Sequence, residues 1–193
     1  MNAVSGILAM ARAQDDWGRH LDQSLHAVRR SFWAFVMFLP PAILVSEATR
    51  RQSIYSGATN ELLSAPIAYV SADLLSVAVV WTATLIIYIA IARRLGNEGG
   101  IPALIIAQNW AQFVLYLILA VPLGLSAVTG MYVLNGMAFL FVIGASFWID
   151  WGIMRRALRL TVPAALALII GMLVFSMLIS VGVTGIVASL VAA

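Results

Sequence analysis

Apolar residues run in long blocks along most of this chain, separated by short polar segments. About 20 helical residues cross a hydrocarbon core of about 30 Å, and most of the blocks reach that length. The pattern therefore predicts an all-α fold, a polytopic transmembrane helical bundle of five spans in sequential antiparallel order. The spans are expected at about 31–46, 66–92, 101–128, 131–149 and 163–193.

The first block is the shortest, and Pro40 and Pro41 interrupt it. Its 16 residues would extend only about 24 Å as a helix, so a re-entrant segment is the alternative to a full crossing. A full crossing puts nine arginines on one side of the membrane and two, Arg50 and Arg51, on the other, whereas a re-entrant block divides them six and five. Because cytoplasmic segments carry the positive excess, we expect five spans, a cytoplasmic N-terminus and a periplasmic C-terminus.

Residues 1–30 have a different pattern. Apolar side chains recur there at steps of three and four, which places them on one helical face, and charged residues occupy much of the remainder. The apolar members are Trp17, Leu21, Leu25, Val28 and Phe32. This segment is predicted to form an amphipathic helix that lies in the cytoplasmic membrane interface, ahead of the transmembrane bundle at 31–193.

The amino-acid composition indicates that the fold is surrounded by a lipid bilayer. Apolar residues make up 63% of the chain and charged residues 10%, against about 45–50% and 25% in soluble domains. The net positive charge lies beside the spans, so it indicates membrane topology and no binding of nucleic acid. Eleven basic residues, all arginine, indicate a bacterial protein, and we expect it in the inner membrane.

Three amide side chains lie inside the third block. Gln108 and Gln112 are one helical turn apart, and Asn109 is a neighbour of Gln112 on the same helix. Amides in hydrocarbon need hydrogen-bond partners, so this face should point into protein or into a wet cavity. Two interpretations stay open, a contact between helices and a solute pathway.

Two aspartates lie near or within the spans. Asp73 is about two turns into the second block, and it forms part of a polar intramembrane cluster if it faces the amides. Three interpretations of Asp73 stay open: it lies in the membrane interface, it binds a proton or a cation, or it pairs with Arg50 or Arg51. Asp150 ends the fourth block, and we expect a boundary residue that pairs with a nearby arginine.

Small residues recur every fourth position on the last helix, a spacing that lets helices approach closely. They are Ser176, Ser180, Thr184 and Ala188, continued by Ala192. We expect this stripe to pack against another helix, of this chain or of a second copy.

Five arginines line the predicted cytoplasmic boundary, where they favour anionic lipid head groups or act as topology determinants alone. They are Arg93, Arg94, Arg155, Arg156 and Arg159.

The sequence predicts no enzyme. Its two histidines, His20 and His26, both lie in the N-terminal segment, and there is no cysteine. Histidine-based triads and metal sites therefore cannot be assembled within the spans, and thiol chemistry is excluded. The glycine-rich turn at 96–100 lacks the lysine and the strand of a phosphate-binding loop. We expect no catalytic residue, cofactor or metal.

Three features together resemble the Yip1-type membrane proteins, and also small bacterial multipass proteins of unknown function. They are Ser31-Phe32-Trp33 before a short span with Pro40-Pro41, the turn at Arg93-Arg94, and the segment Ala107-Gln108-Asn109-Trp110-Ala111-Gln112. The resemblance implies five helices after a cytoplasmic segment, and a non-enzymatic protein that works through partners or lipid.

The resulting hypothesis is a non-enzymatic multipass inner-membrane protein that serves as a scaffold, accessory subunit or membrane-organising element. The alternative is a small oligomeric transporter or channel with a polar route near Gln108 and Gln112. Expected partners are the lipid bilayer, anionic lipids, and further copies or a larger membrane complex.

Overall fold

The computed structural model describes residues 3–192, and the regular elements in that range are all helical. Five helices are long: α4 (Trp33–Tyr55), α6 (Pro66–Arg94), α7 (Ile101–Thr129), α8 (Val133–Arg156) and α9 (Val162–Ala192). The shorter ones are α1 (Ala3–Ala11), α2 (Trp17–His20), α3 (Leu25–Ser31), α5 (Glu61–Ser64) and the 3-10 turn η1 (Glu98–Gly100). Five segments of the described chain are long and apolar enough to cross a membrane, which confirms the predicted bundle.

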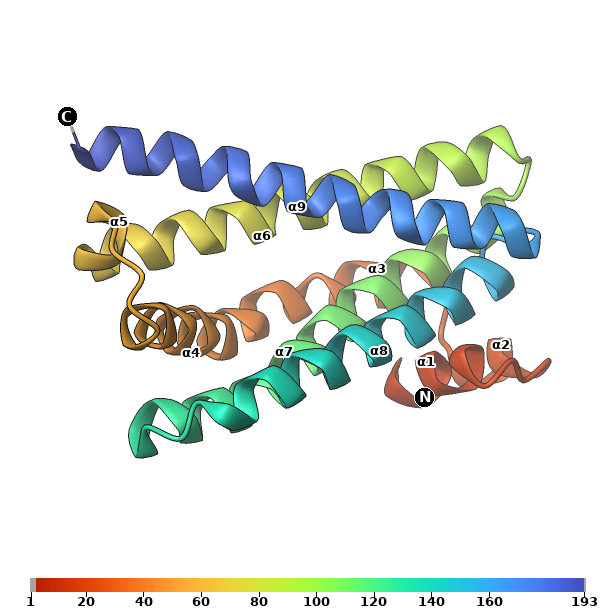
Figure 1. Ribbon diagram of the computed structural model, residues 1–193. Coiled ribbons are helices and arrows are strands. Elements are labelled where there is room, and N and C mark those ends of the chain that lie inside the picture. The colour runs from red at the N-terminus through yellow and green to blue at the C-terminus, as the bar shows by residue number, and fades with distance from the viewer. Residues whose placement is uncertain (1–2, 193) are drawn as a thin grey trace.

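The long helices form two pairs that diverge. α6 packs mainly on α9, and α7 packs on α8 and on α4. In Figure 1 the two pairs approach each other at the end that carries the α6–α7 and α8–α9 turns, and they spread apart toward the opposite end. This divergence leaves space between four helices inside the membrane-spanning region.

The end where the pairs approach each other is called the arginine-rich end below. It holds the N-terminal helices and both of these turns, and hence nine of the eleven arginines. Asn97 Nδ2 donates a hydrogen bond of 2.7 Å to the Ala157 carbonyl, which joins the two turns. Gly100 also lies against that carbonyl, with no room there for a Cβ. The two connections are thus fixed to each other.

The first span is longer than predicted. α4 continues through Pro40 and Pro41 and runs to Tyr55, well beyond residue 46. Its last turns are polar, but Glu47 accepts from Arg50 at 2.7 Å and from Arg51 at 2.8 Å. Such pairs at i+3 and i+4 support a helix that hydropathy alone would end early. The candidate span that contains α4 begins at residue 25. The re-entrant alternative was based on the short length of the first block, and the observed span is not short.

The N-terminal segment is helical, but it is not one amphipathic helix. The predicted apolar stripe is divided: Leu21 is buried, whereas Leu25, at the start of α3, is 67% exposed. α1 packs onto α7 and α8 instead, with Ile7 and Met10 in the main core of the bundle. A new helix begins at α3 because the Ser24 side chain caps it by accepting from the Ala27 N–H at 3.2 Å.

Candidate functional site

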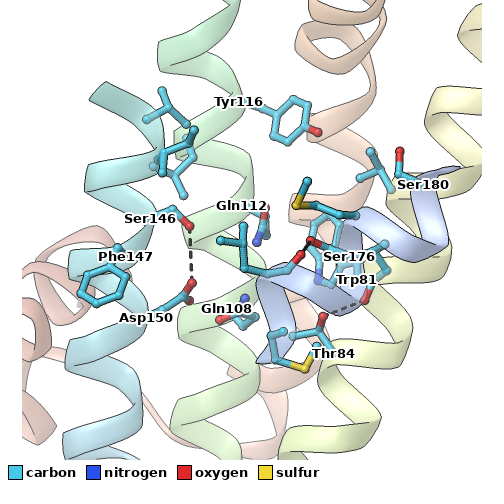
Figure 2. A pocket seen from close by; sticks show the side chains of 18 of the residues that line it. Trp81, Thr84, Gln108, Gln112, Tyr116, Ser146, Phe147, Asp150, Ser176 and Ser180 are labelled. Carbon is cyan, nitrogen blue, oxygen red and sulfur yellow. Dashed lines mark hydrogen bonds between the residues drawn. The ribbon is translucent and has the colours of Figure 1, made fainter. Parts of the chain in front are cut away.

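A cavity of about 480 Å³ lies between α6, α7, α8 and α9, where the two helix pairs diverge. Figure 2 shows the side chains that point into it from all four helices. Its polar lining consists of Asp73, Ser76, Thr84, Gln108, Gln112, Ser146, Asp150, Ser176 and Ser180, together with Tyr88 and Tyr116. Apolar side chains complete the walls, so the cavity is amphipathic.

Helical spacing explains why so many polar groups face one space. Residues four apart lie on one face of a helix. The cavity receives such pairs from α7, α8 and α9. These pairs are Gln108 with Gln112, Ser146 with Asp150, and Ser176 with Ser180. The rest of each span is largely apolar, so the polar faces can meet only where the helices enclose them.

Asp150 is the acidic group at the arginine-rich end of the cavity. Ser146 Oγ donates to its Oδ2 across 3.4 Å, and the Gln108 amide lies beside the carboxylate (Figure 2). The predicted pairing of Asp150 with an arginine is wrong. Arg155 and Arg156 follow it by five and six residues, and neither spacing brings two side chains onto one helical face.

These two arginines have other partners. Arg155 donates to the Leu160 carbonyl and lies 6.0 Å from the Trp151 ring centre. Arg156 donates to Asp15 Oδ1 at 2.8 Å and to the Ala13 carbonyl, which holds the loop after α1. The Asp150 carboxylate is therefore left to the cavity.

Gln108 has an acceptor without a partner. Its side chain is only 3% exposed, and within the described part of the chain no donor reaches its Oε1 atom. A buried acceptor of this kind costs about 1–3 kcal/mol of folding free energy when nothing donates to it. A turn of the Gln108 side chain, which belongs to the cavity wall, would bring this acceptor to a molecule in the cavity.

Asp73 lies at the other end of the same cavity. It lies beside Ser46 of α4, and about four turns of α6, or about 22 Å, separate it from Tyr88 near Asp150. One of the predicted alternatives was an ion pair between Asp73 and Arg50 or Arg51. Within the described chain both arginines pair with Glu47 instead. Asp73 does share the cavity with the two glutamines, as one interpretation of the polar cluster expected.

Asn109 is directed elsewhere. Trp81 Nε1 donates to its Oδ1 at 3.0 Å, and its Nδ2 donates to Ser31 Oγ at 2.9 Å. The side chain is 1% exposed. Asn109 thus joins α6, α7 and the end of α3. The predicted cluster divides into a buried structural amide and three residues that line the cavity.

The small-residue stripe of α9 borders two cavities. Ser176 and Ser180 line the first, and a second cavity of about 680 Å³ between α5 and α9 is lined by Ser180, Thr184 and Ala188. α9 packs on α6, and the predicted packing of the stripe itself stays a prediction. Small side chains on this face keep the space open where α9 leaves its neighbours.

The acidic side chains of the cavity have no basic counterpart in its described wall. Its described lining includes two aspartates and no arginine, lysine or histidine. Groups of three or more His, Cys, Asp or Glu side chains that would hold a metal are absent from the described residues. The site therefore suits a cation or a hydrogen-bond donor better than an anion.

The arginines expected at lipid head groups all lie at the arginine-rich end. Arg93, Arg94 and Arg159 are exposed there, while Arg155 and Arg156 make the intramolecular contacts described above. Arg155 is exposed as well, and of the five Arg156 alone is half-buried.

Sequence reasoning missed Asp150 and Ser146 as members of the site. The spacing of Ser146 and Asp150 within one apolar block was the available signal.

No family model, curated protein or solved structure matches this chain.

Proposed function

We propose that this multipass membrane protein is a small transporter that binds a polar solute in the cavity between its diverging helix pairs. The observation that carries the proposal is the convergence of polar side chains from four helices on one intramembrane space within a single chain. Polar groups inside a bilayer need partners. Here Gln108 Oε1 lacks one within the described chain, and a turn of its side chain toward the cavity would let water or solute supply it.

A route from the opposite end supports the same function. Ser180 lines both cavities, and the second one is bordered by Asn60 and Glu61 near that end of the bundle. Solute would enter there and follow the polar face of α9 inward.

The arginine-rich end favours a transporter over an open channel. An apolar core fills it, with Met10, Leu104 and Met154 all 0% exposed. A site that is reached from one side and closed on the other is what alternating access requires. With that end cytoplasmic by its arginine excess, this conformation is open to the periplasm of a bacterial inner membrane.

Thiol labelling tests whether the cavity is wet. The chain has no cysteine, so a Ser176→Cys variant carries a single thiol in the cavity wall. A membrane-impermeant maleimide added to intact cells should label it. A matched Leu178→Cys variant should resist labelling, because Leu178 is 67% exposed outside the cavity and faces lipid. Equal resistance at both positions would exclude a water-filled cavity and with it the proposed transport.

A scaffold or accessory subunit is the second candidate function. It is favoured by α9, of whose most apolar stretch only 6% is buried within the chain. Native mass spectrometry in lipid separates the two candidates. A stoichiometric complex with a different protein would favour the accessory role, and a monomer or homo-oligomer that carries solute would favour the transporter. Neither function involves a chemical step.

A further inference from the structure

We infer that the Asp150 end of the cavity binds a small organic cation through a primary ammonium group that donates to Asp150 and, once the Gln108 side chain turns toward the cavity, to Gln108 Oε1. This inference rests on the proposed transport function and names the chemical class of the solute.

Charge selects a cation. Asp150 and Asp73 lie at the two ends of the cavity, and its described lining offers no basic side chain to either. Charges interact strongly in a low-dielectric interior, so the uncompensated carboxylates attract a cation and repel an anion.

Hydrogen bonding selects an ammonium group with N–H donors. The Asp150 carboxylate has about four acceptor positions, and two side chains offer it donors, Ser146 Oγ at a long 3.4 Å and the Gln108 amide, so acceptor positions remain free. The Gln108 side chain, 3% exposed, adds an acceptor with no donor of its own. Two neighbouring acceptors that need donors match an ammonium group, which has three donors and no acceptor.

Size and wall chemistry select an organic cation rather than a bare ion. A volume of about 480 Å³ falls within the about 300–1,000 Å³ typical of small-molecule pockets. Trp81 and Phe147, both labelled in Figure 2, line the same space together with Tyr88. Their rings accommodate an apolar carbon skeleton and favour a nearby positive charge.

Binding should be measured by isothermal titration calorimetry on the full chain in lipid nanodiscs at pH 7. Three probes share one skeleton: phenethylammonium, its N,N,N-trimethyl analogue and phenethyl alcohol. The first should bind about tenfold or more tightly than either other probe, because the quaternary cation leaves Gln108 Oε1 without a donor and the alcohol lacks the charge.

Two variants locate the site. Asp150→Asn should weaken binding of both cations by about tenfold or more. Gln108→Leu should abolish the preference for the primary over the quaternary cation. The matched controls Asp16→Asn and Gln14→Leu change exposed residues of the N-terminal segment, and both should bind as the unaltered chain does. If a variant fails to fold, the comparison of the three probes on the unaltered chain still decides.

Equal or tighter binding of the quaternary probe would overturn the inference, and so would ammonium binding that survives Asp150→Asn in a folded protein. Absence of ammonium binding while Ser176→Cys is labelled would reject the ammonium class and leave the transport proposal standing. Absence of both ammonium binding and Ser176→Cys labelling would reject the cation inference and the transport proposal together.

Discussion

Gly152 of α8 lies directly against the backbone of Ala11 in α1: a Cβ at position 152 would come within 2.5 Å of Ala11 Cα. Backbone atoms cannot move aside as the end of a flexible side chain can. The docked position of α1 therefore depends on glycine at this position.

Gly152→Ala should loosen α1 from the bundle. Overpacking of this kind costs about 1–3 kcal/mol, and the movable partner is the short N-terminal helix. Hydrogen–deuterium exchange should rise over residues 3–11 while the long helices stay protected. Gly144→Ala on the same helix is the control, since a Cβ at position 144 would meet nothing within 4 Å. Unchanged exchange in α1 of the Gly152 variant would contradict the tight contact.

Asn109→Leu should destabilise the bundle, because Trp81 Nε1 and Ser31 Oγ lose their shared partner. The expected loss is about 1–3 kcal/mol in free energy of unfolding. The transition should be followed by circular dichroism during chemical denaturation in detergent. Gln112→Leu is the matched control, since Gln112 lines the cavity. It should cost less, and a larger loss for Gln112 would refute the structural role of Asn109.

Glu47→Gln should loosen the last turns of α4. Its carboxylate accepts from both Arg50 and Arg51, and Arg50 also donates to the Leu63 carbonyl at 2.7 Å, which ties α4 to α5. Exchange should rise over residues 51–64 and stay unchanged in the first half of α4. Glu61→Gln, an exposed change on α5, serves as the control. Equal effects of the two variants would argue against the ion pairs.

Arg93→Gln together with Arg94→Gln should reduce the binding of anionic lipid. Both side chains are exposed at the arginine-rich end, and each basic residue near a negative membrane surface contributes about 1 kcal/mol. Native mass spectrometry after extraction from mixed lipid should show fewer phosphatidylglycerol adducts. Arg51→Gln at the opposite end is the control. Equal adduct numbers in the double variant and the unaltered chain would leave topology as the role of these arginines.

Hydropathy predicted four of the spans directly, because each contains a long apolar stretch, whereas the arginine count decided for the first block, which Pro40 and Pro41 interrupt. The end of α4 was missed because hydropathy ignores the pairing of Glu47 with Arg50. The break in the N-terminal segment was missed because apolar periodicity alone was followed, and the cap that Ser24 makes at the start of α3 was not considered.

The candidate site was only partly predictable. Gln108 and Gln112 were identified because amides are rare in hydrocarbon and these two share a helical face. Asp150 was misinterpreted because nearness in sequence to arginines was taken for nearness in space. The cavity itself depends on the divergence of α6–α9 from α7–α8, which no local pattern encodes. The resemblance to Yip1-type proteins stays a prediction.

The sparse burial of α9 has a consequence for biogenesis. The helices α1 to α8 supply nearly all of the main core, whereas α9 supplies one wall of the cavity. Chains are made from the N-terminus, and earlier segments fold first. A nascent chain released only as far as Arg156 would already hold most of its packing and have no binding site. Insertion of α9 is thus the step that completes the cavity, and with it the site at which solute binding is proposed.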